Sequence, residues 1–194
     1  MAFRPIHIAT IALLFLAAGC GQKNDSKIGD QQQSQIRGTA DGSANVAEVF
    51  AITRRPDKVP NFSWKDGTGR TADFDSFHGK VTLINFWATW CGPCKRELPD
   101  LIALSQELAG MNIKILGVAT DRVPNAMDLV GSFVKEQNIP YLNVLSNDDL
   151  EDAFGNPRAI PTSFLVDSNG KIVQTIVGMR SKDFYRQAMT ALAQ

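Results

Sequence analysis

The sequence predicts an α/β domain with a mixed central β-sheet and helices on both faces. Apolar, β-branched runs alternate along the chain with segments in which apolar residues recur at helical spacing. The last two strand-like runs are separated only by Ser168-Asn169-Gly170, which is a tight-turn signal. Strands that alternate with helices indicate a parallel portion of the sheet, and a closing hairpin adds antiparallel strands.

The predicted elements follow one another from residue 59 to residue 194. A β-hairpin is expected around Asp66-Gly67 and Thr68-Gly69, at the leading edge of the domain. The run VTLINFWA is rich in β-branched and aromatic residues, as expected of a central buried strand. In order, we expect a strand at 81–88, a helix at 91–110, a strand at 112–120, a helix at 125–137, a strand at 141–146, a short helix at 148–154, strands at 163–167 and 171–178, and a last helix capped by Ser181.

The composition is that of one globular domain without a charge bias. The chain has 194 residues, of which 44% are hydrophobic and 21% are charged, which excludes a fibrous or disordered protein. Its 20 basic residues balance its 20 acidic residues, so the net charge does not indicate a nucleic-acid partner. We expect a monomer that binds no nucleic acid.

The first 19 residues are expected to be a leader that is removed from the mature chain. Arg4 supplies a positive start, and the apolar run at 8–18 is too short to span a bilayer as a mature helix. Small residues and then Cys20 follow, a pattern that resembles a bacterial lipoprotein signal. The resemblance implies that Cys20 carries a lipid and anchors the protein to a bacterial membrane, facing the periplasm or the cell exterior. The alternative is an ordinary secretory leader, and either leader exports the chain to a compartment where disulfides persist.

Residues 20–58 are expected to be a flexible linker between the lipidated cysteine and the folded domain. Residues 21–45 contain almost no large apolar side chain, so they cannot bury enough surface to offset the entropy lost on ordering. The run VAEVFAI at 46–52 is apolar enough to dock on the domain, although the sequence gives it no definite position. The folded domain is expected to span residues 59–194.

Two cysteines lie where the central strand gives way to a helix. Cys91 at the start of that helix is near unpaired backbone N–H groups and the positive end of the helix dipole, which favour thiolate over thiol. Cys94 lies three residues later, on the same face and within reach of Cys91. Pro93 fits the first helical turn, and Gly92 lets the backbone of a partner come close. This pattern predicts a redox-active pair.

Other uses of a CxxC pair fit the sequence less well. A structural zinc site needs four ligands, and only His78 remains after a leader that carries His7 is removed. Haem attachment requires histidine after the second cysteine, where this chain has Lys95. A purely structural disulfide across so short a loop would contribute little. We therefore expect no metal, and because GxGxxG is absent we expect no nicotinamide or flavin cofactor.

The stretch WCGPC at 90–94 resembles the active site of the thioredoxin superfamily. The wider pattern VTLINFWATWCGPCKRELPDL, with the upstream hairpin and the downstream IPTSFLVDSNGKIV, resembles the TlpA/ResA-like branch of membrane-tethered thiol–disulfide oxidoreductases. The resemblance covers roughly residues 60–194 and implies a thioredoxin-like three-layer sandwich with an N-terminal β-hairpin extension. Some members of this branch serve cytochrome c maturation.

Carried over to this chain, the resemblance makes Cys91 the nucleophilic cysteine and Cys94 the resolving cysteine. Trp90 is expected to pack beside the site, with simple core packing as the alternative. Ile160-Pro161 matches the cis-proline position that faces the CxxC, where the residue before proline offers backbone hydrogen bonds to a bound peptide. A trans proline in an ordinary loop is the alternative.

Proton transfer is expected to differ from that of thioredoxin, which has a buried aspartate in the strand before the active site. Here that position is Asn85, which cannot take up a proton at neutral pH. Glu97 matches the acidic residue that follows the motif in the TlpA/ResA-like branch, and we hypothesise that it helps to deprotonate Cys94. The alternative is a solvated glutamate in the first turn that interacts with the helix dipole.

The Gly-Pro pair between the cysteines is shared with thioredoxin, a strong reductant, so we expect a reductant of protein disulfides. It would need electrons from a membrane reductase, since the chain shows no cofactor motif. A thioredoxin-fold peroxidase is one alternative, but that class has threonine three places before its cysteine, whereas Thr89 is two places before Cys91. A non-catalytic binding lipoprotein is another, but it would have no need of an intact CGPC.

Overall fold

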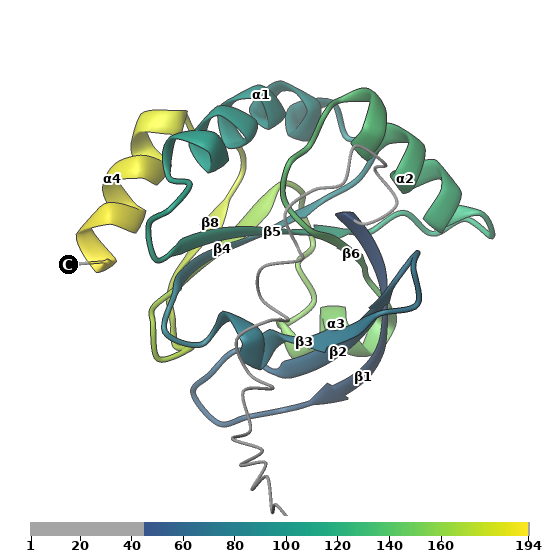
Figure 1. Cartoon of the computed structure of the whole chain (residues 1–194), viewed down its shortest axis with the longest axis horizontal. Helices are drawn as coiled ribbons and strands as arrows, with labels where there is room; N and C mark the ends of the chain where they lie inside the picture. Colours follow the sequence, from purple (N-terminus) through teal and green to yellow (C-terminus); the bar gives the residue numbers. More distant parts are fainter. Residues whose placement is uncertain (1–44, 194) are drawn as a thin grey trace, which may run out of the picture. The chain divides into compact units, whose positions relative to one another are not determined.

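An eight-stranded mixed sheet forms the centre of the fold, with the strand order β3-β2-β1-β6-β5-β4-β7-β8 (Figure 1). The computed structural model describes residues 45–193, so the leader, Cys20 and most of the expected linker lie outside the described residues. The strands are β1 (Val46–Thr53), β2 (Asn61–Asp66), β3 (Thr71–Asp73), β4 (Val81–Trp87), β5 (Ile113–Ala119), β6 (Asn143–Leu145), β7 (Thr162–Val166) and β8 (Ile172–Val177).

The strand directions confirm the predicted mixed sheet. Strands β1, β6, β5 and β4 are parallel neighbours, while β7 pairs antiparallel with β4 and β8 pairs antiparallel with β7. On the other side, β2 and β3 form the expected antiparallel hairpin. The predicted α/β fold with a mixed central sheet and an N-terminal hairpin is therefore confirmed.

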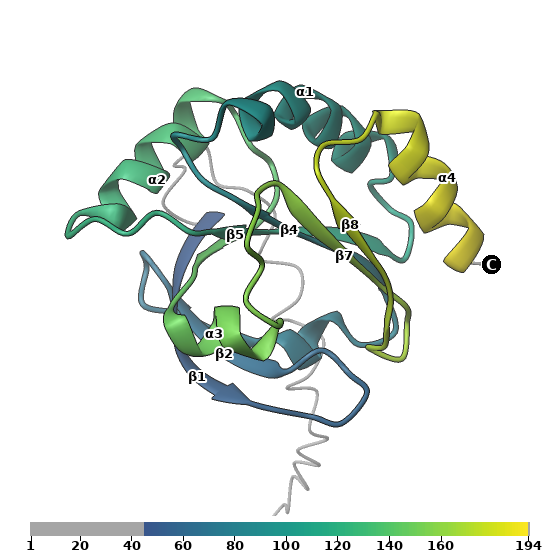
Figure 2. The ribbon, with the colours of Figure 1, turned by 180° about the vertical axis from the view of Figure 1, so that it is seen from behind.

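Helices lie on both faces of the sheet, as the two opposite views show (Figures 1 and 2). Helices α1 (Gly92–Glu107), α2 (Ala126–Glu136) and α4 (Lys182–Leu192) cover one face. The short helix α3 (Asp148–Ala153) lies on the opposite face, and a 3₁₀ turn η3 (Phe74–Phe77) follows β3. Within residues 45–193, none of the helices has the length and apolar character needed to cross a bilayer.

Strand β1 corrects the expected domain boundary at residue 59. The sequence places its residues in the flexible linker, yet β1 pairs with β6 on one side and with β2 on the other. Val46, Ala47 and Val49 are buried in the core. These apolar side chains give the segment enough buried surface to order it, so the folded part begins before residue 59.

Strand β4 connects the core to the functional site. All seven of its residues are buried, as predicted for a central strand, and its side chains alternate between the two faces. Ile84 and Phe86 enter the core shared with α3, whereas Leu83 packs under α1 and α4. Asn85 and Trp87 also lie on the α1 side, so β4 brings two hydrogen-bonding side chains beneath the start of that helix.

Candidate active site

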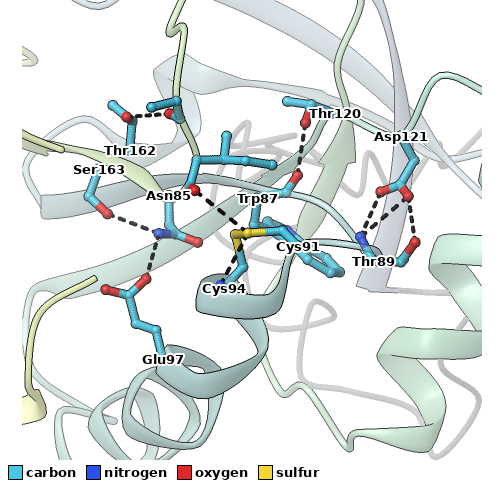
Figure 3. Close-up of a disulfide and its surroundings, with 12 residues drawn as sticks. Asn85, Trp87, Thr89, Cys91, Cys94, Glu97, Thr120, Asp121, Thr162 and Ser163 are labelled. Atoms are coloured by element: carbon cyan, nitrogen blue, oxygen red, sulfur yellow. Dashed lines mark hydrogen bonds between the residues drawn. A yellow bond between two sulfur atoms is a disulfide. The ribbon is translucent and has the colours of Figure 1, made fainter. Parts of the chain in front are cut away.

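Cys91 and Cys94 form a disulfide at the N-terminus of α1 (Figure 3). Cys91 is the residue that caps the helix, and its Sγ accepts a hydrogen bond of 3.2 Å from the backbone N–H of Cys94. Pro93 lies in the first turn, where its missing N–H leaves no intrahelical bond unmade. Donors at a helix start stabilise negative charge, so this position favours the thiolate of Cys91 once the disulfide is reduced.

The segment before β7 lies against the same sulfur. The Ile160–Pro161 peptide bond is cis, and the carbonyl oxygen of Ile160 lies 3.6 Å from Cys91 Sγ. The backbone N–H of Gly178 donates to the carbonyl oxygen of Pro161 at 2.8 Å, which ties this segment to the end of β8. The structure thus brings Ile160 and Pro161 together with the cysteines, although 66 residues separate Ile160 from Cys94 (160 − 94).

A buried carboxylate holds the loop before Cys91. Asp121 is 5% exposed, and it accepts hydrogen bonds from the backbone N–H and the hydroxyl of Thr89. Next to it, Thr120 donates to the carbonyl oxygen of Trp87 from both its N–H and its hydroxyl. Figure 3 shows both contacts on the side of the disulfide away from Glu97. The end of β5 therefore fixes the path of the chain from β4 into the active-site loop.

Glu97 lies one helical turn after Cys94 and belongs to a closed ring of hydrogen bonds. Its Oε2 accepts from the Asn85 amide at 3.3 Å, and its Oε1 accepts from the Tyr185 hydroxyl at 2.9 Å. The Asn85 amide also donates to Ser163 Oγ at 2.9 Å, and that hydroxyl lies 3.2 Å from the Tyr185 hydroxyl. The backbone N–H of Arg180 supplies one more donor to Oε1, at 2.8 Å. Glu97 is therefore fixed in place by β4, β7 and α4 together.

The surroundings of Glu97 shift the pKa of its carboxyl above the ordinary value of a glutamate. Burial is the largest influence and raises its pKa, while the donors from Arg180, Tyr185 and Asn85 and the Arg180 charge act in the opposite direction. The net pKa shift is upward. Burial also raises the pKa of Tyr185, so its hydroxyl keeps its proton and remains a donor to Glu97.

The exposure of Glu97 and of Trp90 excludes the alternative interpretation that the sequence left for each of them. Glu97 is 2% exposed, so it is not a solvated glutamate of the first turn. Trp90 is 68% exposed, so it does not pack in the core, and its ring stands on the surface next to Cys91. Cys91 and Cys94 are themselves buried in the disulfide form, at 3% and 5% exposed. A partner thus meets Trp90 first and the sulfurs only at close approach.

Three residues of the site were missed by sequence reasoning: Ser163, Tyr185 and Asp121. Ser163 follows Pro161 by two residues and was assigned only to a strand. Tyr185 is on the buried face of α4, where its ring is fully buried, and periodicity marks such a position as core. The position of Asp121 directly after a buried strand was a usable signal, because side chains at the carboxyl ends of neighbouring parallel strands meet at one edge of the sheet.

The arrangement can exchange one S–S bond for two thiols. Two sulfurs lie within bonding distance at a helix start, a backbone carbonyl faces one of them, and a carboxyl with a raised pKa lies one turn further along. Exchange by thiolate attack needs such an ionised sulfur and a group that manages the proton of the other.

Comparison with known proteins agrees with this chemistry. The family model described as Redoxin matches residues 55–191. The thiol–disulfide oxidoreductase ResA of Bacillus thuringiensis subsp. konkukian is 31% identical over 127 residues, which cover 65% of this chain and 71% of the relative. A thiol:disulfide interchange protein of the thioredoxin family from Chlorobium tepidum has a TM-score of 0.65 at 31% identity, covering 72% of this chain and 98% of that one. StoA from Bacillus subtilis has a TM-score of 0.59 at 26% identity, covering 69% of this chain and 98% of that one.

The matched region contains the whole site, from Asn85 in β4 to Tyr185 in α4. The chain therefore belongs to the redoxin family, and it is a thiol–disulfide oxidoreductase of the ResA type with a CxxC pair.

Proposed function

We propose that the protein reduces disulfides in other proteins, with Cys91 as the nucleophile and Cys94 as the resolving cysteine. The observation that carries this assignment is the position of Cys91 at the N-cap of α1, where the Cys94 N–H bonds to its sulfur. Hydrogen bonds to the charged form lower a thiol pKa, and the thiolate is the attacking species.

The reaction balances in two exchange steps. The Cys91 thiolate attacks one sulfur of the substrate disulfide, which forms a mixed disulfide and releases the other substrate sulfur as a thiolate. Cys94 loses its proton and attacks Cys91 Sγ, which forms the Cys91–Cys94 disulfide and releases the second substrate sulfur. The substrate gains two electrons, and the protein needs an external dithiol reductant to return to its reduced form.

Glu97 takes the proton of Cys94 in the second step of this proposal. It lies three residues after Cys94 on α1, and its raised pKa makes its carboxylate a stronger base than that of an exposed glutamate. Asn85, at the strand position where thioredoxin has its aspartate, donates to Glu97 and so supports the ionised carboxylate.

We also propose that the protein works outside the cytoplasm, attached to a bacterial membrane through a lipid on Cys20. The leader pattern at residues 1–19, with Cys20 directly after it, supports this location. A reductant with a Gly-Pro pair would there serve a compartment that oxidises thiols. A membrane reductase would supply the electrons, and apocytochrome c during cytochrome c maturation is one protein substrate that fits this setting.

Trapping with Cys94→Ala tests the two cysteine roles. Without the resolving thiol, the mixed disulfide on Cys91 should persist, so the full-length variant expressed in its own cells should accumulate adducts that dithiothreitol releases. Cys91→Ala is the matched control and should accumulate far fewer adducts. Equal trapping by both variants would overturn the assignment of the nucleophile, and no adduct with either variant would overturn the reductase proposal.

A further inference from the structure

Three chain segments border the disulfide, and the charged side chains that they carry are all cations. The segments are 88–96 around the cysteines, 158–162 around the cis-proline and 177–180 at the end of β8. Their charged residues are Lys95, Arg96, Arg158 and Arg180, and all four are exposed. This is a local excess, because the whole chain has a formal net charge of zero.

Arg96 and Arg180 are placed closest to the reacting sulfurs. The Nη1 of Arg96 lies 3.8 Å from the point that a Cβ on Gly92 would occupy, so its guanidinium lies over the residue between the cysteines. The guanidinium of Arg180 donates to the carbonyl oxygens of Gly178 and Met179 and lies beside the Phe184 ring. The backbone N–H of Arg180 bonds to Glu97, which places it beside the same end of α1.

These four cations form no ion pair in the described part of the chain, although the Arg180 charge acts on the buried Glu97. The ion pairs among residues 45–193 involve other arginines and lysines. The two carboxylates of the site, Glu97 and Asp121, are 2% and 5% exposed and accept their hydrogen bonds from the protein itself. A partner at the disulfide therefore meets positive charge together with the exposed side chains of Trp90 and Met179.

On this basis we infer that the surface formed by Trp90, Lys95, Arg96, Arg158, Met179 and Arg180 selects protein disulfides whose cysteines are flanked by acidic residues. The inference rests on the proposed reductase function and names its substrate class. Charge complementarity around a reacting group speeds encounter and disfavours partners of the wrong charge. A basic flank would place like charges against Arg96 and Arg180 at the moment of sulfur attack, and an acidic flank would pair with them.

Three model peptides with one intramolecular disulfide test this inference. They share one sequence, except that the residues flanking the cysteines are all Glu, all Gln or all Lys. The prereduced protein is mixed with each peptide, and the rate of peptide reduction is followed by acid quenching and chromatography. Each rate is divided by the rate with dithiothreitol, which removes the intrinsic reactivity of the peptide.

The normalised rate should be highest for the Glu peptide and lowest for the Lys peptide, with a difference of about tenfold or more at low ionic strength. In about 1 M salt, where the Debye length falls to about 3 Å, the difference should largely disappear. Arg96→Gln and Arg180→Gln should each reduce the preference. Lys114→Gln is the matched control with the same change in charge, at the opposite end of β5 from the site, and it should keep the preference.

The outcomes separate this inference from the function on which it rests. Equal normalised rates for the three peptides, or a preference for the Lys peptide, would overturn the inference and leave the reductase proposal intact. A Glu preference that both arginine variants keep in full would overturn the assignment to this surface. Failure of the reduced protein to reduce any of the three peptides would overturn the reductase proposal itself.

Discussion

On one face of β4, Ile84 and Phe86 are buried among aromatic rings, whereas on the other face Asn85 supports a buried carboxylate. Around Phe86 the first face is aromatic: the Phe86 ring lies 5.2 Å from Phe154 and 5.5 Å from Phe164 between centroids. The second face holds Glu97, which burial alone would make unfavourable as an anion. One strand thus builds a region that stabilises the fold and a region that carries chemistry at a cost in stability.

The cost on the polar face is limited because each of the four side chains in the ring is hydrogen-bonded to its neighbours in the ring. Glu97 accepts from three donors, and the hydroxyl groups of Ser163 and Tyr185 bond to each other. A buried polar group that is fully hydrogen-bonded avoids most of the desolvation penalty. The two faces should therefore respond differently to substitution, one in global stability and the other in the pH dependence of the reaction.

Phe86→Ala should have the largest effect on stability. Phe86 is fully buried, and its truncation leaves a cavity beside the Phe154 and Phe164 rings, so the free energy of unfolding should fall by about 3–5 kcal/mol. Urea unfolding of the oxidised protein measures the loss. Where the variant is folded, the pH profile of thiol exchange should match that of the wild type. A loss below about 1 kcal/mol would contradict tight packing of this face.

Glu97→Gln should give the largest effect on the reaction. The amide cannot accept the proton of Cys94, so the resolving step should slow by about a hundredfold or more at neutral pH, the range typical of a general base. The pH at which the rate of the resolving step rises should also increase, toward the pKa at which the Cys94 thiol ionises without a base. Stopped-flow measurement of release from a preformed Cys91 mixed disulfide isolates this step. An unchanged rate and profile would remove Glu97 from the mechanism.

The elements on both faces could largely be predicted from local sequence, but strand β1 could not. The apolar run of β4 and the helical spacing after Cys91 are local signals, and the turn at 168–170 has glycine where φ is positive, at Gly170. Strand β1 depends on its pairing with β6, where Val46 meets Asn143 across 97 residues (143 − 46). No local pattern encodes such a pairing.

The sequence predicted the residues of the site that carry a motif, but not the residues that hold Glu97 in place. Cys91, Cys94 and the Ile160-Pro161 segment carry motifs that can be read directly from the sequence. The hydrogen bond from Tyr185 to Glu97 arises from the way α4 packs beside α1. In sequence, Tyr185 shows only the apolar periodicity of a core residue. That its hydroxyl contacts Glu97 becomes visible only in the folded structure.

Tyr185→Phe should change both the free energy of unfolding and the pH profile of the reaction, each by less than the corresponding substitution above. Loss of one hydrogen bond to Glu97 should cost about 1–2 kcal/mol of unfolding free energy. Because the hydroxyl lowers the pKa of Glu97, its removal should raise that pKa further and shift the pH profile of the resolving step upward. Tyr141→Phe is the matched control: this tyrosine feels the charge of Glu97 without a hydrogen bond to it. Equal shifts in both variants would contradict a specific role for Tyr185.

The smallest expected effect is a pH-dependent difference in stability between the wild type and Glu97→Gln. The raised pKa of Glu97 means that the folded protein holds a proton which the unfolded chain has lost. The stability that this proton provides is complete below the pKa of the unfolded chain and is lost as pH rises through the folded pKa. The glutamine side chain of the variant does not titrate, so the variant should gain stability relative to the wild type as pH rises.

Asp66→Asn provides the comparison of opposite sign for this measurement. Burial acts to raise the pKa of Asp66, but hydrogen bonds from Thr68 and Arg70 together lower it. Its contribution is therefore present above the pKa of the unfolded chain and lost as pH falls through the folded pKa. Urea unfolding of both variants and the wild type from about pH 2 to about pH 8 should give difference curves of opposite slope, with the Asp66 change at the acidic end of this range. Parallel curves would show that Glu97 is not held at a raised pKa, and the polar face of β4 would then carry no cost in stability.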